Sequence, residues 1–189
     1  DSAVKLSSRI NRVEPSPTLA ITSKAKAMIA DGIDVVSFGA GEPDFATPET
    51  VRTKAKAALD AGHTTYLPSS GLPQLRAAVA GDYRRRGREI TDDQVIVSVG
   101  GKHAHYNATQ LRFERGDKVI IPAPYWVSYP AQVLLADAEP VTPLAGIEDE
   151  FKLTPEALAA ELEDPAIRGF ILCSPSNPTG AVYSREELQ

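Results

Sequence analysis

The sequence predicts an α/β fold, in which a mainly parallel sheet is covered by helices on both faces in a three-layer α/β/α arrangement. Two observations lead to this fold class. From residue 94 onward, apolar β-branched runs alternate with helical segments that are long enough to connect parallel strands. At 97–104, such a run meets paired glycines and then a helix start. We therefore expect βαβ units with right-handed crossovers.

Composition and charge narrow the class of protein. The 189 residues are 42% hydrophobic and 24% charged, with a net charge of −5, which suits a globular domain with a substantial core. The charges are spread along the chain, so no nucleic-acid partner is expected. No apolar run reaches the ~18 residues of a membrane span. Cys173 is the only cysteine, which excludes a disulfide within the chain and fits a cytoplasmic location.

The N-terminal region predicts an arm followed by helices. Pro15 and Pro17 interrupt the first 17 residues, so an extended arm is expected, either loosely ordered or docked on another subunit. Thr47, Pro48 and Glu49 form a strong helix start, with a capping side chain, a proline in the first turn and an acidic residue near the positive end of the helix dipole.

The remaining elements follow from apolar periodicity and from stop signals. Helices are expected at 18–30, 48–61, 73–86, 102–114, 125–136 and 155–164. Strands are expected at 35–38, 94–99, 118–121, 139–142 and 168–173. Ser184 and Glu187 are spaced as a capping box that opens a further helix close to the last residue, so we expect the chain to be the front portion of a longer protein.

The double-glycine turn at Gly100 and Gly101 is a candidate anion site. A helix that begins there presents unpaired N–H groups and the positive end of its dipole, which together suit a phosphate group. The signal is weak alone, because the chain lacks both the nucleotide P-loop pattern and the G-x-G-x-x-G fingerprint after a strand.

Three segments with different chemistry follow expected strands, and ligands of such sheets lie beyond the carboxyl ends of the strands. Gly101 and Lys102 supply amides for an anion, Trp126 supplies an aromatic face for a planar ring, and Asn177 supplies a carboxamide. Alone, Trp126 is more often a core residue and Asn177 a turn former. Together they match a planar aromatic group that bears a phosphate.

Five motifs in this order resemble the class I pyridoxal-phosphate-dependent aminotransferases, most closely the bacterial aspartate aminotransferases. The motifs lie at 40–45, 66–71, 100–102, 124–126 and 176–180. The resemblance implies a fold-type I architecture and a homodimer with shared active sites. It implies an arm and small-domain segment at 1–45, and the first, incomplete part of the large cofactor-binding domain at 46–189.

The resemblance also implies roles for individual residues. The amides of Gly101 and Lys102 would hold the phosphate of pyridoxal 5′-phosphate, with Lys102 acting through its backbone. Trp126 would stack on the pyridine ring and border the substrate. Asn177 would hydrogen-bond the phenolic oxygen of the cofactor and help to orient the substrate carboxylate.

Two further positions complete the implied site. The Gly41 amide would contact the substrate carboxylate, and Tyr66 would reach the phosphate held by the partner subunit. The family's Schiff-base lysine, the aspartate beside the pyridine nitrogen and the carboxylate-binding arginine all fall beyond residue 189. No catalytic residue is therefore expected within the chain, no metal is expected, and residues 1–189 alone are predicted to be inactive.

The function implied for the whole protein is transamination between an amino acid, aspartate first, and 2-oxoglutarate, within amino-acid biosynthesis. Two alternatives stay open: another fold-type I enzyme, a lyase or synthase, and a non-catalytic ligand-sensing or dimerisation domain of the same fold.

In the helix after Gly101, the residues Ala104, Ala108 and Leu111 predict an apolar stripe, with His105 and Arg112 on a polar flank.

Overall fold

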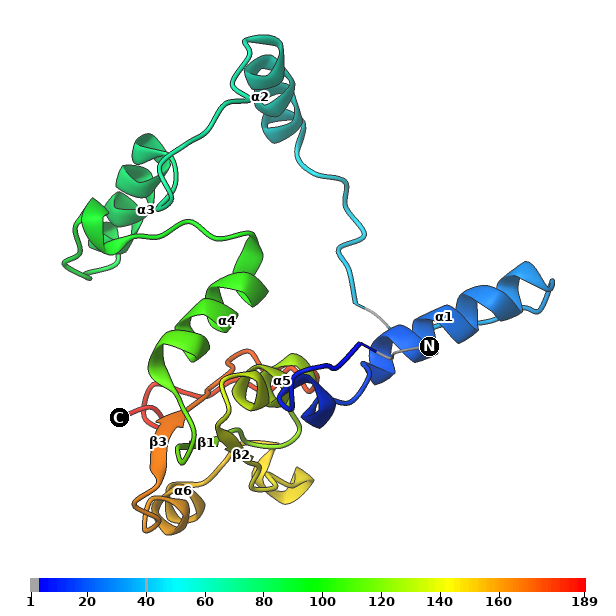
Figure 1. Ribbon diagram of the computed structural model, residues 1–189, viewed down its shortest axis with the longest axis vertical. Helices are drawn as coiled ribbons and strands as arrows, with labels where there is room; N and C mark the ends of the chain where they lie inside the picture. Colours follow the sequence, from blue (N-terminus) through cyan, green and yellow to red (C-terminus); the bar gives the residue numbers. More distant parts are fainter. Residues whose placement is uncertain (1–3, 40) are drawn as a thin grey trace. The chain divides into compact units, whose positions relative to one another are not determined.

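The computed structural model describes residues 4–39 and 41–189. Ala40, which opens the 40–45 motif, and the first three residues of the arm lie outside the described residues. The chain divides into two compact units, one made of residues 1–16 and 101–189 and the other of residues 17–100. Figure 1 traces the elements along the chain.

A three-stranded parallel sheet forms the centre of the first unit, which confirms the α/β class. Its strands are β1 (Lys118–Ile120), β2 (Glu139–Val141) and β3 (Ile167–Phe170), in the order β2-β1-β3. Helix α5 (Ser128–Leu135) connects β1 to β2, and α6 (Pro155–Glu161) connects β2 to β3, as parallel pairing requires. Figure 1 shows these elements gathered together.

The core of this unit lies between the sheet and α5. Val119, Ile121, Val133 and Ala138 are buried together, and partly buried side chains pack around them: Phe113, Tyr125, Tyr129 and Ile171. A Cβ added at Gly169 of β3 would collide with the ring of Phe113. The glycine therefore lets this aromatic ring lie directly on the strand.

Among its described residues, the second unit contains three α-helices at nearly the expected positions. They are α1 (Pro17–Ala30), α2 (Glu49–Asp60) and α3 (Pro73–Arg85). Pro73 occupies the first turn of α3, where its missing N–H costs nothing. The prediction that Thr47 caps α2 was wrong. The helix begins at Glu49, one residue later than expected, with Pro48 at the capping position and no side-chain cap.

Two expected strands, 35–38 and 94–99, do not form among the described residues. The backbone at Val95 is extended, with φ −110° and ψ 128°, so the β-branched run does set the local conformation. A strand also needs a neighbour to receive its hydrogen bonds, and Val97 N donates instead to Ser70 O, at 2.9 Å. Ile96 is 71% exposed and Val99 is 87% exposed.

The N-terminal arm docks on its own chain. Arg12 makes an ion pair with Asp137 at 3.0 Å and donates to Ala138 O at 3.1 Å. Arg115 pairs with the other carboxylate oxygen of Asp137 at 2.8 Å. Arg115, with Arg12 adding to the positive charge, lowers the pKa of Asp137 below its ordinary value. Loose order does not describe this contact, while docking of the arm on another subunit stays a prediction.

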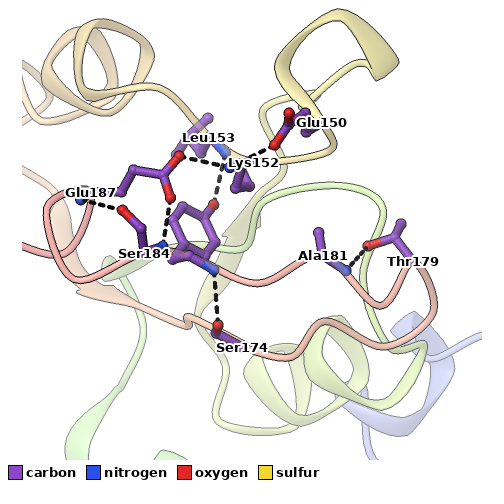
Figure 2. Close-up of polar contacts among 9 residues, drawn as sticks. Glu150, Lys152, Leu153, Ser174, Thr179, Ala181, Ser184 and Glu187 are labelled. Carbon is purple, nitrogen blue, oxygen red and sulfur yellow. Dashed lines mark hydrogen bonds and ion pairs between the residues drawn. The ribbon is translucent and has the colours of Figure 1, made fainter.

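The segment after β3 returns to the loop that precedes α6 (Figure 2). The hydroxyl of Tyr183 accepts a hydrogen bond from Leu153 N at 2.7 Å. Ser184 N donates to Glu187 Oε2 at 2.6 Å, and Glu187 N donates to Ser184 Oγ at 3.2 Å. These reciprocal bonds confirm the expected capping box, although residues 185–188 form a turn.

Lys152 connects this C-terminal turn to the rest of the unit. Its ammonium group pairs with Glu187 at 2.7 Å and with Glu150 at 2.8 Å (Figure 2). The two carboxylates raise the pKa of Lys152, and the lysine in turn lowers the pKa of Glu187. Among the described residues, no helix has the length and apolar character needed to cross a membrane.

Candidate cofactor-binding site

The first turn of α4 (Gly100–Arg112) has an approachable backbone. The helix begins at Gly100, the first glycine of the pair, which is two residues earlier than expected. Gly100 has φ +76°, a left-handed conformation that glycine adopts without strain. A Cβ added at Gly101 would meet no protein atom within 4 Å. Because the first N–H groups of a helix have no partner within it, this turn can bind an anion.

The indole of Trp126 lies beside this turn. The Lys102 ammonium is 4.9 Å from the centre of the indole ring, and the ring of Tyr129 meets the indole edge-on, with centroids 5.3 Å apart. Trp126 is half-buried, while Gly101 and Lys102 are exposed. The structure therefore brings Trp126 close to Lys102, which lies 24 positions earlier in the sequence.

A polar network between α4 and α5 holds these groups. The side chain of Gln132 donates from Nε2 to the Lys102 carbonyl at 3.1 Å, and its Oε1 lies 2.5 Å from His105 Nδ1. The His105 ring packs on Tyr129 with centroids 5.0 Å apart. Thr109 Oγ1 donates to the His105 carbonyl at 2.8 Å. Gln132 and Thr109 are buried, so the contact between the helices has a polar centre.

Sequence reasoning missed this network because it placed His105 on a polar flank of the helix. Ala104, Ala108 and Leu111 are exposed, Leu111 to 91%, whereas His105 lies on the packed side. Arg112 is exposed, as expected. Helical periodicity identifies candidate faces, but it does not say which of them a neighbouring helix covers. Polar side chains can fill a buried face when they satisfy one another.

The turn that contains Asn177 follows β3. It is closed by hydrogen bonds from Ser176 N to Ala181 O and from Gly180 N to Ser176 O, both 2.8 Å. Asn177 is exposed, and its neighbour Ser176 lines a small pocket of about 20 Å³ together with Tyr125. This pocket brings the segments that follow β1 and β3 to one place.

Tyr129 lies between this pocket and the indole. It lines the pocket together with Cys173, and burial, followed by a hydrogen bond with that thiol, raises the pKa of Tyr129 to about 12. Its hydroxyl is therefore neutral at physiological pH.

Gly41 and Tyr66 belong to the unit of residues 17–100, and both are exposed. A Cβ at Gly41 would meet no protein atom within 4 Å, so its amide is approachable. The loop that begins at Tyr66 is fixed at its far end, where Gly71 has φ +104° and a Cβ there would lie 2.6 Å from the Val97 side chain. Within 4–39 and 41–189, no cluster of three or more metal-binding side chains occurs.

Comparison with known proteins gives the family. Residues 33–189 match the model of aminotransferase class I and II. The chain belongs to this family. The resemblance that the five motifs predict is thereby confirmed.

Its relatives include proteins named as aminotransferases. The chain is 51% identical to an aspartate/prephenate aminotransferase of Cereibacter sphaeroides, over 97% of this chain and 46% of the relative. It is 48% identical to an aspartate aminotransferase of Geobacillus stearothermophilus, over 98% of this chain and 47% of the relative. The chain thus spans about half the length of the curated relatives that it matches.

Solved structures agree with this assignment. An aspartate aminotransferase from Thermus thermophilus, solved with maleate, superposes with a TM-score of 0.93 at 42% identity, covering 98% of this chain and 49% of that one. One from Rhizobium meliloti gives a TM-score of 0.92 at 38% identity, covering 98% and 46%.

Aspartate aminotransferases are pyridoxal 5′-phosphate enzymes, and this aminotransferase chain has residues that suit the cofactor. The approachable amides at Gly101 and Lys102 suit a phosphate monoester, and the indole beside them suits a planar heterocycle. The donor set of this turn therefore fits the cofactor.

Proposed function

We propose that the full-length protein containing this chain is a pyridoxal-phosphate-dependent aminotransferase that exchanges the amino group of aspartate with 2-oxoglutarate. The observation that carries the proposal is the indole of Trp126 beside the approachable amide turn of Gly101 and Lys102. The named aspartate aminotransferases among its relatives support the choice of amino donor.

Each proposed residue has a distinct physical task. The amides of Gly101 and Lys102 donate to the cofactor phosphate, and the α4 dipole favours its negative charge. Trp126 covers one face of the heterocycle and helps to exclude water from it. Asn177 donates a hydrogen bond to the phenolic oxygen and orients the substrate carboxylate. The bound cofactor supplies an electron sink for bonds at the α-carbon of the substrate.

The substrate and the partner subunit involve the other unit. The Gly41 amide donates to the substrate carboxylate, and Tyr66 donates to the phosphate held by the second subunit of a homodimer. The division into an arm with a small-domain segment at 1–45 and a large-domain portion at 46–189 belongs to the same proposal. The lysine that anchors the cofactor lies outside residues 1–189, so this segment alone does not transaminate.

A second acceptor, prephenate, is a candidate on one observation. The Cereibacter sphaeroides relative at 51% identity carries the name aspartate/prephenate aminotransferase. Both acceptors are dicarboxylic 2-oxo acids, so competition between them in one assay decides which the enzyme prefers.

The test reconstitutes the full-length apoenzyme with pyridoxal 5′-phosphate. An absorbance band of bound cofactor and the formation of oxaloacetate from aspartate are the expected results. Release of ammonia or elimination products in place of oxaloacetate would indicate a lyase or synthase. The absence of any cofactor band would favour a non-catalytic scaffold. Residues 1–189 under the same conditions should give no exchange above that of free cofactor.

A further inference from the structure

The amide side chain of Gln132 joins the first turn of α4 to the face of α5. Gln132 is only 5% exposed, and both ends of its amide have partners. Nε2 donates to the Lys102 carbonyl at 3.1 Å, and Oε1 lies 2.5 Å from His105 Nδ1. A buried amide with both ends engaged is held in one orientation, because any other orientation leaves buried polar atoms without partners.

The hydrogen-bond chemistry gives one consistent assignment. The Lys102 carbonyl only accepts, so the NH₂ group of Gln132 must face it. Oε1 then faces His105 and needs a donor, which assigns a proton to Nδ1 of the imidazole. Thr109 Oγ1 lies 3.3 Å from the same nitrogen and donates its own proton to the His105 carbonyl. Its oxygen can therefore accept a bifurcated hydrogen bond from Nδ1–H. The Lys102 carbonyl thereby fixes the direction of the Gln132 amide, and the amide fixes the tautomer of His105.

The same network reaches the indole. The Lys102 ammonium lies over the ring of Trp126, and Tyr129 contacts both that ring and His105. The amide turn and the aromatic face are therefore held by one set of contacts between two helices. A shift of α4 along α5 would change the distance between the phosphate-binding amides and the indole.

We propose that Gln132, oriented by the Lys102 carbonyl and paired with His105, is a positioning residue that holds the first turn of α4 in register with Trp126, so that the site binds a phosphorylated cofactor in preference to its unphosphorylated form. The inference rests on the proposed function. It adds that phosphate affinity depends on a buried side chain that does not itself touch the cofactor.

The test compares two ligands that differ only in the phosphate. The apoenzyme of the full-length protein is titrated with pyridoxal 5′-phosphate and with pyridoxal, with absorbance as the readout. Gln132→Met keeps an unbranched side chain of similar length and removes both hydrogen bonds. It should weaken binding of pyridoxal 5′-phosphate roughly five- to tenfold, as expected for the loss of one hydrogen bond, and change pyridoxal binding less than about twofold.

Two further variants guard against a trivial result. The double variant His105→Leu with Gln132→Met leaves no buried imidazole N–H without its partner, so it should fold even if the single variant does not. It should show the same selective loss, because the Lys102 contact is still missing. Gln110→Met is the matched control, since the one hydrogen bond of the Gln110 side chain among the described residues is a donation to the main-chain oxygen of Gln132, at 3.5 Å. It should bind both ligands as the parent does.

The outcomes separate the two claims. If the parent apoenzyme binds neither ligand, the proposed function is wrong and this inference falls with it. If the parent prefers the phosphorylated ligand and the Gln132 variants keep that preference, or lose affinity for both ligands equally, Gln132 is merely structural and the inference alone is overturned.

Discussion

The adjacent glycines at the start of α4 lead to opposite predictions for the same substitution. Gly100 has φ +76°, so Gly100→Ala forces an alanine into the left-handed region at a cost of roughly 1–2 kcal/mol. Gly101 has no protein atom within 4 Å of an added Cβ and is the second residue of α4. Gly101→Ala should therefore stabilise the apoenzyme by up to about 1 kcal/mol, through helix propensity.

Cofactor binding should respond to Gly101→Ala in the opposite direction. The methyl group would occupy space that we assign to the phosphate, and overpacking of this kind costs roughly 1–3 kcal/mol. The dissociation constant for pyridoxal 5′-phosphate should therefore rise roughly five- to 150-fold. The Gly101→Ala apoenzyme would therefore be more stable than the parent apoenzyme, while its affinity for the cofactor would be lower.

The assay pairs thermal unfolding of the full-length apoenzyme with a cofactor titration for the parent and both variants. Gly100→Ala should lower the unfolding midpoint, which shows that the measurement detects backbone strain in this turn. If Gly101→Ala is stable and binds the cofactor as tightly as the parent, no phosphate approaches this backbone, and the reasoning behind the site is refuted.

Three other predictions follow from single contacts. In an absorbance titration, Trp126→Leu should weaken binding of pyridoxal 5′-phosphate about tenfold, while Trp126→Phe keeps most of the affinity. If both variants lose affinity equally, the indole does not stack on the cofactor. Gly169→Ala should destabilise the fold by roughly 1–3 kcal/mol in urea unfolding, because its methyl meets the Phe113 ring, and an unchanged midpoint would contradict this packing. Lys152 holds the pKa of Glu187 below its ordinary 4.5, so this pair stabilises the fold fully above about pH 4.5 and loses its effect as pH falls through the lower, folded-state pKa. The unfolding midpoints of the parent and of Glu187→Gln should therefore converge in acid, and parallel curves would count against the pair.

Local signals in the sequence were sufficient to predict the approximate positions of the helices and the strands of the sheet in the first unit. Helix α6 begins at the expected residue, and the side chain of Thr154 caps it by accepting from Ala157 N at 3.2 Å. The buried apolar run at β1 pairs on both sides. Each of these signals acts within a few residues or excludes water from a run of apolar side chains, so it can be read without knowledge of the neighbours.

The same signals did not predict the structure correctly at 94–99, where the expected strand does not form. The β-branched run there sets an extended backbone, but pairing depends on a second segment, and none is present among the described residues. The glycines and Trp126 could be named in advance because their chemistry is uncommon. Their proximity could not, since it depends on how α4 and α5 pack.

The amino-acid order alone determined where the helices lie to within a few residues, that the run at β1 is a buried strand, and which residue types could meet a phosphorylated ring. The tertiary structure decided that polar side chains fill the contact between α4 and α5, where Gln132 pairs with His105 and donates to the Lys102 carbonyl. The physical reason is that caps and apolar runs act locally, whereas a buried polar pair is stable only when packing brings both partners together.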